Sequence, residues 1–106
     1  MKQEFINPFK LDDEIALITG GGTGIGFGIA KAFVNFGAKV IIVGRREEPL
    51  QKAVKELGHM ADYRVYDVTK YEKSESLIDS INQQHGQISI LVNNAGMHLK
   101  KAAIDV

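Results

Sequence analysis

The chain has 106 residues, of which 44% are hydrophobic and 25% charged, an ordinary composition for one globular domain spanning residues 1–106. Thirteen basic residues balance thirteen acidic ones, so net charge gives no reason to expect nucleic acid or a membrane surface as a partner. The absence of cysteine excludes disulfides, thiolate zinc sites and cysteine nucleophiles. The apolar runs are shorter than the roughly 20 residues that cross a bilayer, and we expect a cytoplasmic protein.

The first half of the chain predicts strands and helices in alternation. Residues 14–19 form an apolar run typical of a buried strand and lead directly into a cluster of glycines. Apolar residues then recur at helical spacing from Ile25 to Phe36, and Gly37 provides a helix end. The β-branched run 40–43 predicts a strand covered on both faces. The helical stripe that we expect to face the core comprises Ile25, Ile29, Ala32, Phe33 and Phe36.

A second helix is predicted before Gly58, which ends it. Pro49 suits its first turn, and Glu47 and Glu48 suit the positive end of its dipole. Residues 62–66 form a weaker strand candidate that follows this helix. The inward face of the helix is expected to comprise Leu50, Ala53, Val54 and Leu57.

The last third of the chain predicts one more helix and one more strand. Thr69 and Glu72 form a capping box, in which the threonine hydroxyl accepts from a backbone N–H and the glutamate reaches back. The helix that follows ends at Gly86, and the apolar run 88–92 predicts a fourth strand. The buried face of this helix is expected to comprise Leu77, Ile78 and Ile81.

Together these elements alternate as β-α-β-α-β-α-β with short connections. That order predicts an α/β fold, a doubly wound parallel sheet with helices on both faces, truncated after about four strands. Such sheets bind ligands at the carboxyl ends of their strands, where the strand order reverses. We therefore look for a site in the loops that follow the strands.

The glycine cluster, residues 19–26, lies where the first strand gives way to a helix. Glycines let the backbone turn tightly and approach a diphosphate, while the helix N-terminus supplies positive potential. The pattern is T-G-x-x-x-G-x-G, without the literal G-x-G-x-x-G spacing and without the lysine of a nucleoside-triphosphate loop. A turn that binds no ligand is the alternative. The residues predicted to bind a dinucleotide here are Gly20, Gly22, Thr23, Gly24, Ile25 and Gly26.

This loop resembles that of the short-chain dehydrogenase/reductases, and two further motifs extend the resemblance over essentially the whole chain. Asp67 follows the third strand, and Asn-Asn-Ala-Gly follows the fourth. The resemblance implies a Rossmann-type NAD(P)-binding domain in which Asp67 contacts the adenine and Val68 adds backbone contacts. It implies that Asn93 holds loops together and that the segment through Ala95 and Gly96 flanks the cofactor ribose. The alternatives are a capping role for the aspartate and asparagines that bond to their own backbone.

The turn after the second strand indicates which nicotinamide cofactor is preferred. An acidic residue about 20 positions past the glycine loop normally binds the ribose hydroxyls of NAD. Gly44 stands there instead, followed by Arg45 and Arg46, and a guanidinium can grip a 2′-phosphate bidentately. We therefore favour NADP(H), with Arg45 as the main phosphate ligand. NAD(H) is the alternative, because Thr23 replaces the basic loop residue of many NADP-preferring relatives, and the arginines can simply offset the two glutamates after them.

The resemblance implies an oxidoreductase that transfers hydride between nicotinamide and a carbonyl or secondary alcohol in a small molecule. The resemblance implies that the family's Ser and Tyr-x-x-x-Lys would follow Val106, so no catalytic residue is assigned. We therefore expect residues 1–106 to be inactive alone. Tyr66 and Lys70 match that spacing but lie in the wrong half of the fold, and we reject them. A non-catalytic dinucleotide-binding module or fragment is the alternative function. Residues 96–101 resemble gluconate and polyol dehydrogenases of the family without identifying a substrate.

Two further expectations concern metals and partners. His59, His85 and His98 lack metal-ligand spacing, so no metal site is predicted, and His85 is expected to interact with a helix dipole. A fourth strand without a fifth beside it would leave an exposed apolar edge. We therefore expect a homo-oligomer or self-association through that edge.

Overall fold

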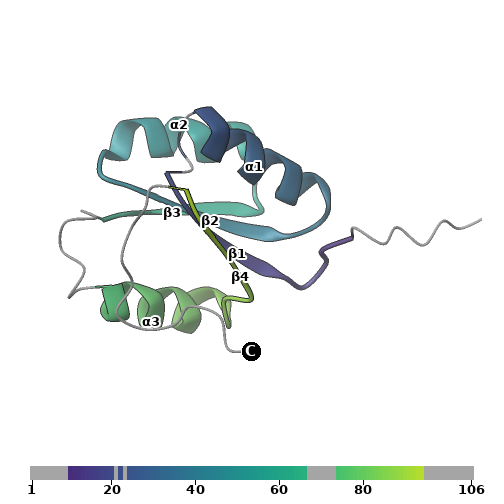
Figure 1. Ribbon diagram of the computed structural model, residues 1–106, viewed down its shortest axis with the longest axis vertical. Coiled ribbons are helices and arrows are strands. Elements are labelled where there is room, and N and C mark those ends of the chain that lie inside the picture. The colour runs from purple at the N-terminus through teal and green to yellow at the C-terminus, as the bar shows by residue number, and fades with distance from the viewer. Residues whose placement is uncertain (1–9, 21, 23, 67–73, 95–106) are drawn as a thin grey trace, which may run out of the picture.

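The computed structural model describes residues 10–20, 22, 24–66 and 74–94, which form a four-stranded parallel sheet flanked by helices (Figure 1). The strand order is β3-β2-β1-β4, so the chain moves outward in one direction and then returns to the other side of β1. The predicted α/β fold class is confirmed. The elements are β1 Ile15–Thr19, α1 Gly24–Asn35, β2 Lys39–Gly44, α2 Glu47–Leu57, β3 Ala61–Val65, α3 Ser74–His85 and β4 Ile90–Asn93.

Helices cover both faces of the sheet: α1 and α2 lie on one face and α3 on the other (Figure 1). Because successive residues of a strand point to opposite faces, Ile18 packs with the helices α1 and α2, whereas Leu17 packs with α3. Both central strands are buried on both faces for this reason, apart from half-buried end residues, which explains their unbroken apolar runs. The inward faces predicted for the second and third helices are confirmed, with Leu50, Ala53, Ile78 and Ile81 buried.

The stripe predicted for the first helix is partly wrong. Ile29 and Phe33 pack against the core as expected, but the residues that α1 buries are Gly26 and Ala30. Small side chains on that face let the helix approach the sheet and the glycine loop closely, which turns the larger flanking residues outward. The members of the predicted stripe that are exposed are Ile25, at 76%, Phe36, at 38%, and Ala32.

The fourth strand begins two residues later than its apolar run predicts. The backbone N–H of Ile88 donates to the side-chain oxygen of Asn82 on α3, at 3.0 Å, instead of joining the sheet. Ser89 then makes the first contact with β1, exchanging hydrogen bonds with the backbone of Ile15. The side chain of Ile88 is fully buried all the same, so burial and strand pairing separate at this position. The predicted capping box at residues 69–72 lies outside the described residues.

The strand order positions the candidate site. β1 lies between β2 and β4, and the chain direction across the sheet reverses between β1 and β4. Loops after adjacent strands diverge at such a reversal and leave a crevice for a ligand. The glycine loop follows β1 at this point. In the described part of the chain, no helix combines the length and apolar character that a membrane crossing requires.

Candidate functional site

The carboxyl ends of β1 and β4 are tied together by side chains. Thr19, the last residue of β1, is fully buried, and its hydroxyl donates to the side-chain oxygen of Asn93 at 3.1 Å. The same hydroxyl lies 3.5 Å from the carbonyl oxygen of Val92. Thr19 and Asn93 are also direct partners in the parallel register of the two strands. The two loops that diverge at the strand reversal therefore begin at a fixed distance from each other.

The glycine loop begins with a backbone held on two sides. Gly20 has a φ of 68°, which favours glycine, and its N–H donates to the carbonyl of Val43 on β2 at 2.8 Å. Its carbonyl accepts from the side-chain amide of Asn94 at 3.5 Å. A Cβ on Gly26 would overlap that carbonyl oxygen and lie 3.0 Å from the amide nitrogen of Asn94. The first turn of α1 thus packs directly against the loop, at a spacing that only glycine permits.

The open side of the loop lies at the start of α1. Gly24, the first residue of the helix, has a φ of 59°, and a Cβ there would meet nothing within 4 Å. The loop is braced from the opposite side by Leu50 of α2, which is 2% exposed. Its Cδ2 would lie 3.3 Å from a Cβ on Gly22 and 3.3 Å from a Cβ on Gly44. One buried side chain therefore supports both the loop after β1 and the turn after β2.

The predicted phosphate-binding arginines follow Gly44 at the surface. Arg45 and Arg46 are both exposed, and within the described ranges neither forms a salt bridge. Arg46 is the N-cap of α2 with an extended backbone and no side-chain capping bond. A shallow cavity of about 300 Å³ beside it is also lined by Glu47 and Glu48, whose charges disfavour an anion. Arg45 is thus better placed than its neighbour to meet a phosphate.

Several of the predicted site residues cannot be placed. The structure does show that Tyr66, just before two of them, donates its backbone N–H to the carbonyl of Gly44 at 2.8 Å. The chain leaving β3 thus passes beside the end of β2. The side chain of Tyr66 is 7% exposed and packs in the core. Thr23, Asp67, Val68, Ala95 and Gly96 lie outside the described residues.

The sequence did not predict the positioning role of three residues. Thr19 and Asn94 bind the loop ends, and Leu50 braces two glycines. Of these, only Asn94 lay in a segment expected at the site, the one that flanks the cofactor ribose, and its bond to the glycine loop was not expected. Thr19 directly precedes the first glycine and Asn94 lies inside the Asn-Asn-Ala-Gly motif, so the signal was present for both. Nothing in the spacing of Leu50 separates it from an ordinary core residue of α2.

Comparison with known proteins identifies the family. The family model described as short chain dehydrogenase matches residues 14–106. A curated relative, the short-chain dehydrogenase/reductase VdtF of Byssochlamys spectabilis, is 46% identical over 84% of this chain and 30% of its own length. The chain therefore spans about a third of that relative.

Two solved structures are similar in both sequence and fold. The 2-keto-3-deoxy-D-gluconate dehydrogenase from Streptococcus agalactiae is 40% identical with a TM-score of 0.76, over 89% of this chain and 36% of that one. An actinorhodin polyketide ketoreductase variant with NADPH is 39% identical with a TM-score of 0.73, over 77% of this chain and 33% of that one. With the family model matching most of its length, this chain belongs to the short chain dehydrogenase family.

Proposed function

We propose that this chain is the NADP(H)-binding half of an oxidoreductase that acts on a carbonyl or secondary alcohol in a small molecule. The observation that carries the proposal is the contact between Gly26 and Gly20, where a Cβ would overlap the loop carbonyl. A backbone packed this closely presents main chain to the crevice where a side chain would otherwise stand. Membership of an oxidoreductase family supports the same conclusion.

The residues present suit a dinucleotide diphosphate. The loop begins α1, a helix of 12 residues, so its N-terminal amides and dipole favour an anion. The first turn of α1 holds no acidic residue that would repel a diphosphate. Gly24 leaves open space beside that turn. When bound, the nicotinamide would supply or accept the hydride, while these residues hold the diphosphate in place.

The preference for NADP(H) over NAD(H) rests on the turn after β2. Gly44 has no side chain to repel a 2′-phosphate, and Leu50 occupies the space into which a longer residue would extend. Arg45 is exposed and has no salt-bridge partner among the residues that the structure describes, so its guanidinium is free to meet a phosphate. A similar structure was solved with NADPH, which supports the same choice.

Replacing Arg45 tests this proposal. We expect Arg45→Gln to weaken NADPH binding roughly tenfold or more, because a charge-assisted hydrogen bond to the phosphate is lost. Binding of NADH should change little, since NADH lacks that phosphate. Lys55→Gln, which removes an exposed cation from the last turn of α2, is the matched control. Equal losses for both cofactors, or none for either, would contradict the role of Arg45.

We propose that the catalytic step uses residues from outside these 106. The chain spans between 30% and 42% of the length of the curated relatives that it matches. We propose that a Ser and a Tyr-x-x-x-Lys pair from the remainder of such a protein complete the active site. Adding a candidate carbonyl substrate and NADPH to the 106 residues alone should therefore give no turnover above the rate without protein.

A further inference from the structure

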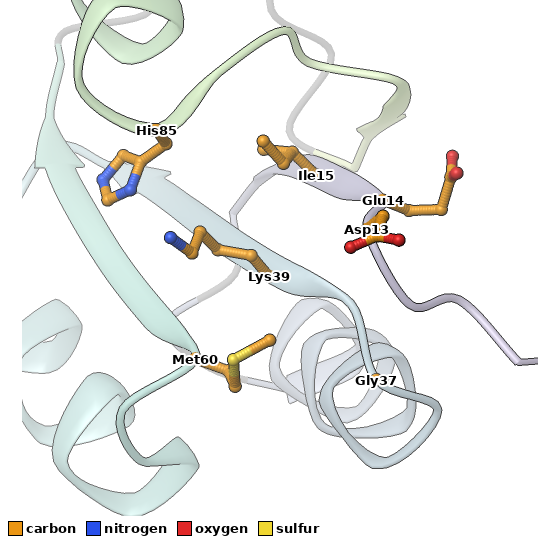
Figure 2. Close-up of a pocket in the computed structure, with 7 residues that line it drawn as sticks. All are labelled: Asp13, Glu14, Ile15, Gly37, Lys39, Met60 and His85. Carbon is orange, nitrogen blue, oxygen red and sulfur yellow. The ribbon is translucent and has the colours of Figure 1, made fainter.

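A second cavity lies at the amino ends of the strands, at the opposite end of the sheet from the glycine loop (Figure 2). Its volume is about 300 Å³, at the lower end of the range for small-molecule sites. The residues that line it come from the turns before β1, β2 and β3, the starts of β1 and β2, and the end of α3. They are Asp13, Glu14, Ile15, Gly37, Lys39, Met60 and His85.

One wall of this cavity is a turn fixed by backbone hydrogen bonds. Leu11 donates to the carbonyl of Phe36 and accepts from the N–H of Glu14 at 3.0 Å. Glu14 in turn accepts from the backbone N–H of Lys39 at 3.0 Å. Asp13, between these anchors, is held at a φ of 70°, a region where aspartate is among the few tolerated residues. The backbone that carries the two carboxylates is therefore fixed.

The opposite wall is His85, the last residue of α3, whose side chain is 12% exposed. Its Nε2 lies 2.7 Å from a carboxylate oxygen of Asp62 on β3. Partial burial raises the pKa of the Asp62 carboxyl, but hydrogen bonds from Arg64, His85 and the backbone of Tyr63 outweigh it and hold that pKa below the usual 3.8. The Asp62 carboxylate thus contacts one ring nitrogen of His85, and this contact holds the imidazole at the edge of the cavity.

The charges across the cavity do not neutralise one another. Lys39 is half-buried and, within the part of the chain that the structure describes, has no salt-bridge partner. Asp13, which is exposed, and Glu14, which is half-buried, have no salt-bridge partner among these residues either. Among the residues that the structure describes, no three His, Asp or Glu side chains lie close enough together to hold a metal ion. Figure 2 shows the amino end of Lys39 turned toward His85, with the carboxylates of Asp13 and Glu14 on the other side. The cavity thus has a cationic pole and a separate anionic pole.

We propose that this cavity binds a small dipolar molecule of the amino-acid class, which carries one carboxylate and one ammonium group. The carboxylate meets Lys39 and His85, and the ammonium meets Asp13 and Glu14. A simple anion would face two uncompensated carboxylates, and a simple cation would face Lys39, so a ligand with both charges is favoured. The proposal does not depend on the nucleotide site, which lies at the other end of the strands.

The test follows backbone amide and imidazole resonances of the ¹⁵N-labelled chain during titration with glycine, β-alanine and γ-aminobutyrate. Acetate and methylammonium, which each carry one of the two charges, are the matched ligands. We expect saturable shifts at Gly37, Lys39 and His85 for at least one dipolar ligand, and at least about tenfold weaker binding of both single-charge ligands. The amide of Gly26, at the nucleotide end, should not move.

Variants assign the two poles. Lys39→Gln and Asp13→Asn should each weaken dipolar binding about tenfold, and asparagine tolerates the positive φ at position 13. Lys31→Gln, which removes an exposed cation from α1, should bind as the wild type does. No saturable shift with any dipolar ligand, or equal affinity for acetate, would overturn the proposal without any variant having to fold. Neither result depends on whether the chain binds NADPH, so the two proposals fail separately.

Discussion

Thr19 and Asn93 are 74 positions apart in the sequence, yet the hydroxyl of one donates to the side-chain oxygen of the other at 3.1 Å. Each residue ends its strand, and the two strands are neighbours in the sheet. The bond fixes the loop after β1 relative to the loop after β4 where the strand order reverses. The crevice between these loops is therefore set by the sheet itself.

Removing this hydroxyl should destabilise the fold. Thr19→Val keeps the size of the buried side chain but removes the hydroxyl that donates to Asn93, and we expect a loss of about 1 kcal/mol in the free energy of unfolding. Urea denaturation measures it. Thr19→Ser, which keeps the hydroxyl and loses a methyl, is the control. If the valine variant were as stable as the wild type, the bond would contribute nothing to the site.

Replacing either of two glycines of α1 with alanine should change the stability of the fold in opposite directions. Gly26→Ala places a Cβ against the carbonyl of Gly20, so the loop must shift, and we expect a loss of about 1–3 kcal/mol in stability. Gly28→Ala, two residues on, meets nothing within 4 Å and should gain about 0.5–1 kcal/mol, because alanine favours the helix. Urea denaturation of both variants tests the pair. Equal changes would mean that the close packing at Gly26 is absent.

The hydrogen bonds to Asp62 predict how stability depends on pH. Because its pKa in the folded chain lies below the usual 3.8, the unfolded chain binds the proton more readily. The stability that the charged Asp62 carboxylate contributes is fully present above pH 3.8. It is lost as the pH falls through the lower pKa of the folded chain. Asp62→Asn should therefore lower stability at neutral pH, by less than about 1 kcal/mol for this partly exposed pair.

The difference between the wild type and Asp62→Asn should shrink as the pH falls below 3.8, as denaturation at a series of pH values would show. Glu56→Gln removes an exposed carboxylate outside this network and serves as the control. A difference that grew in acid would reverse the sign of the argument.

The edge position of β4 predicts self-association. Ile90, Leu91 and Val92 are only half-buried, and in the sheet formed by the described residues β4 pairs with β1 alone. Unpaired backbone groups beside apolar side chains are a template for another strand. Sedimentation velocity should therefore show a mean mass that rises with protein concentration. A monomer at every concentration would contradict this expectation.

The sequence predicted the fold well because hydrophobic period and glycine position encode each element locally. The same local signals could not orient α1, because the contact of Gly26 with Gly20 turns Ile25 outward despite its apolar character. The late start of strand pairing, after Ile88, depends on Asn82, a side chain from another element. The sequence predicted only a helix-dipole interaction for His85. Its bond to Asp62 joins residues 23 positions apart, and no rule of local spacing predicts such a contact.

The central claim is that the main chain from Gly20 to Gly26 holds the diphosphate of a nicotinamide dinucleotide. Titration of the chain with NADPH, followed by nicotinamide fluorescence, tests it most directly when the wild type is compared with Gly26→Ala and Gly28→Ala. We predict saturable binding to the wild type and to Gly28→Ala, and none to Gly26→Ala under conditions where that variant is folded. Equal affinity of a folded Gly26→Ala variant, or no saturable binding to the wild type, would contradict the claim.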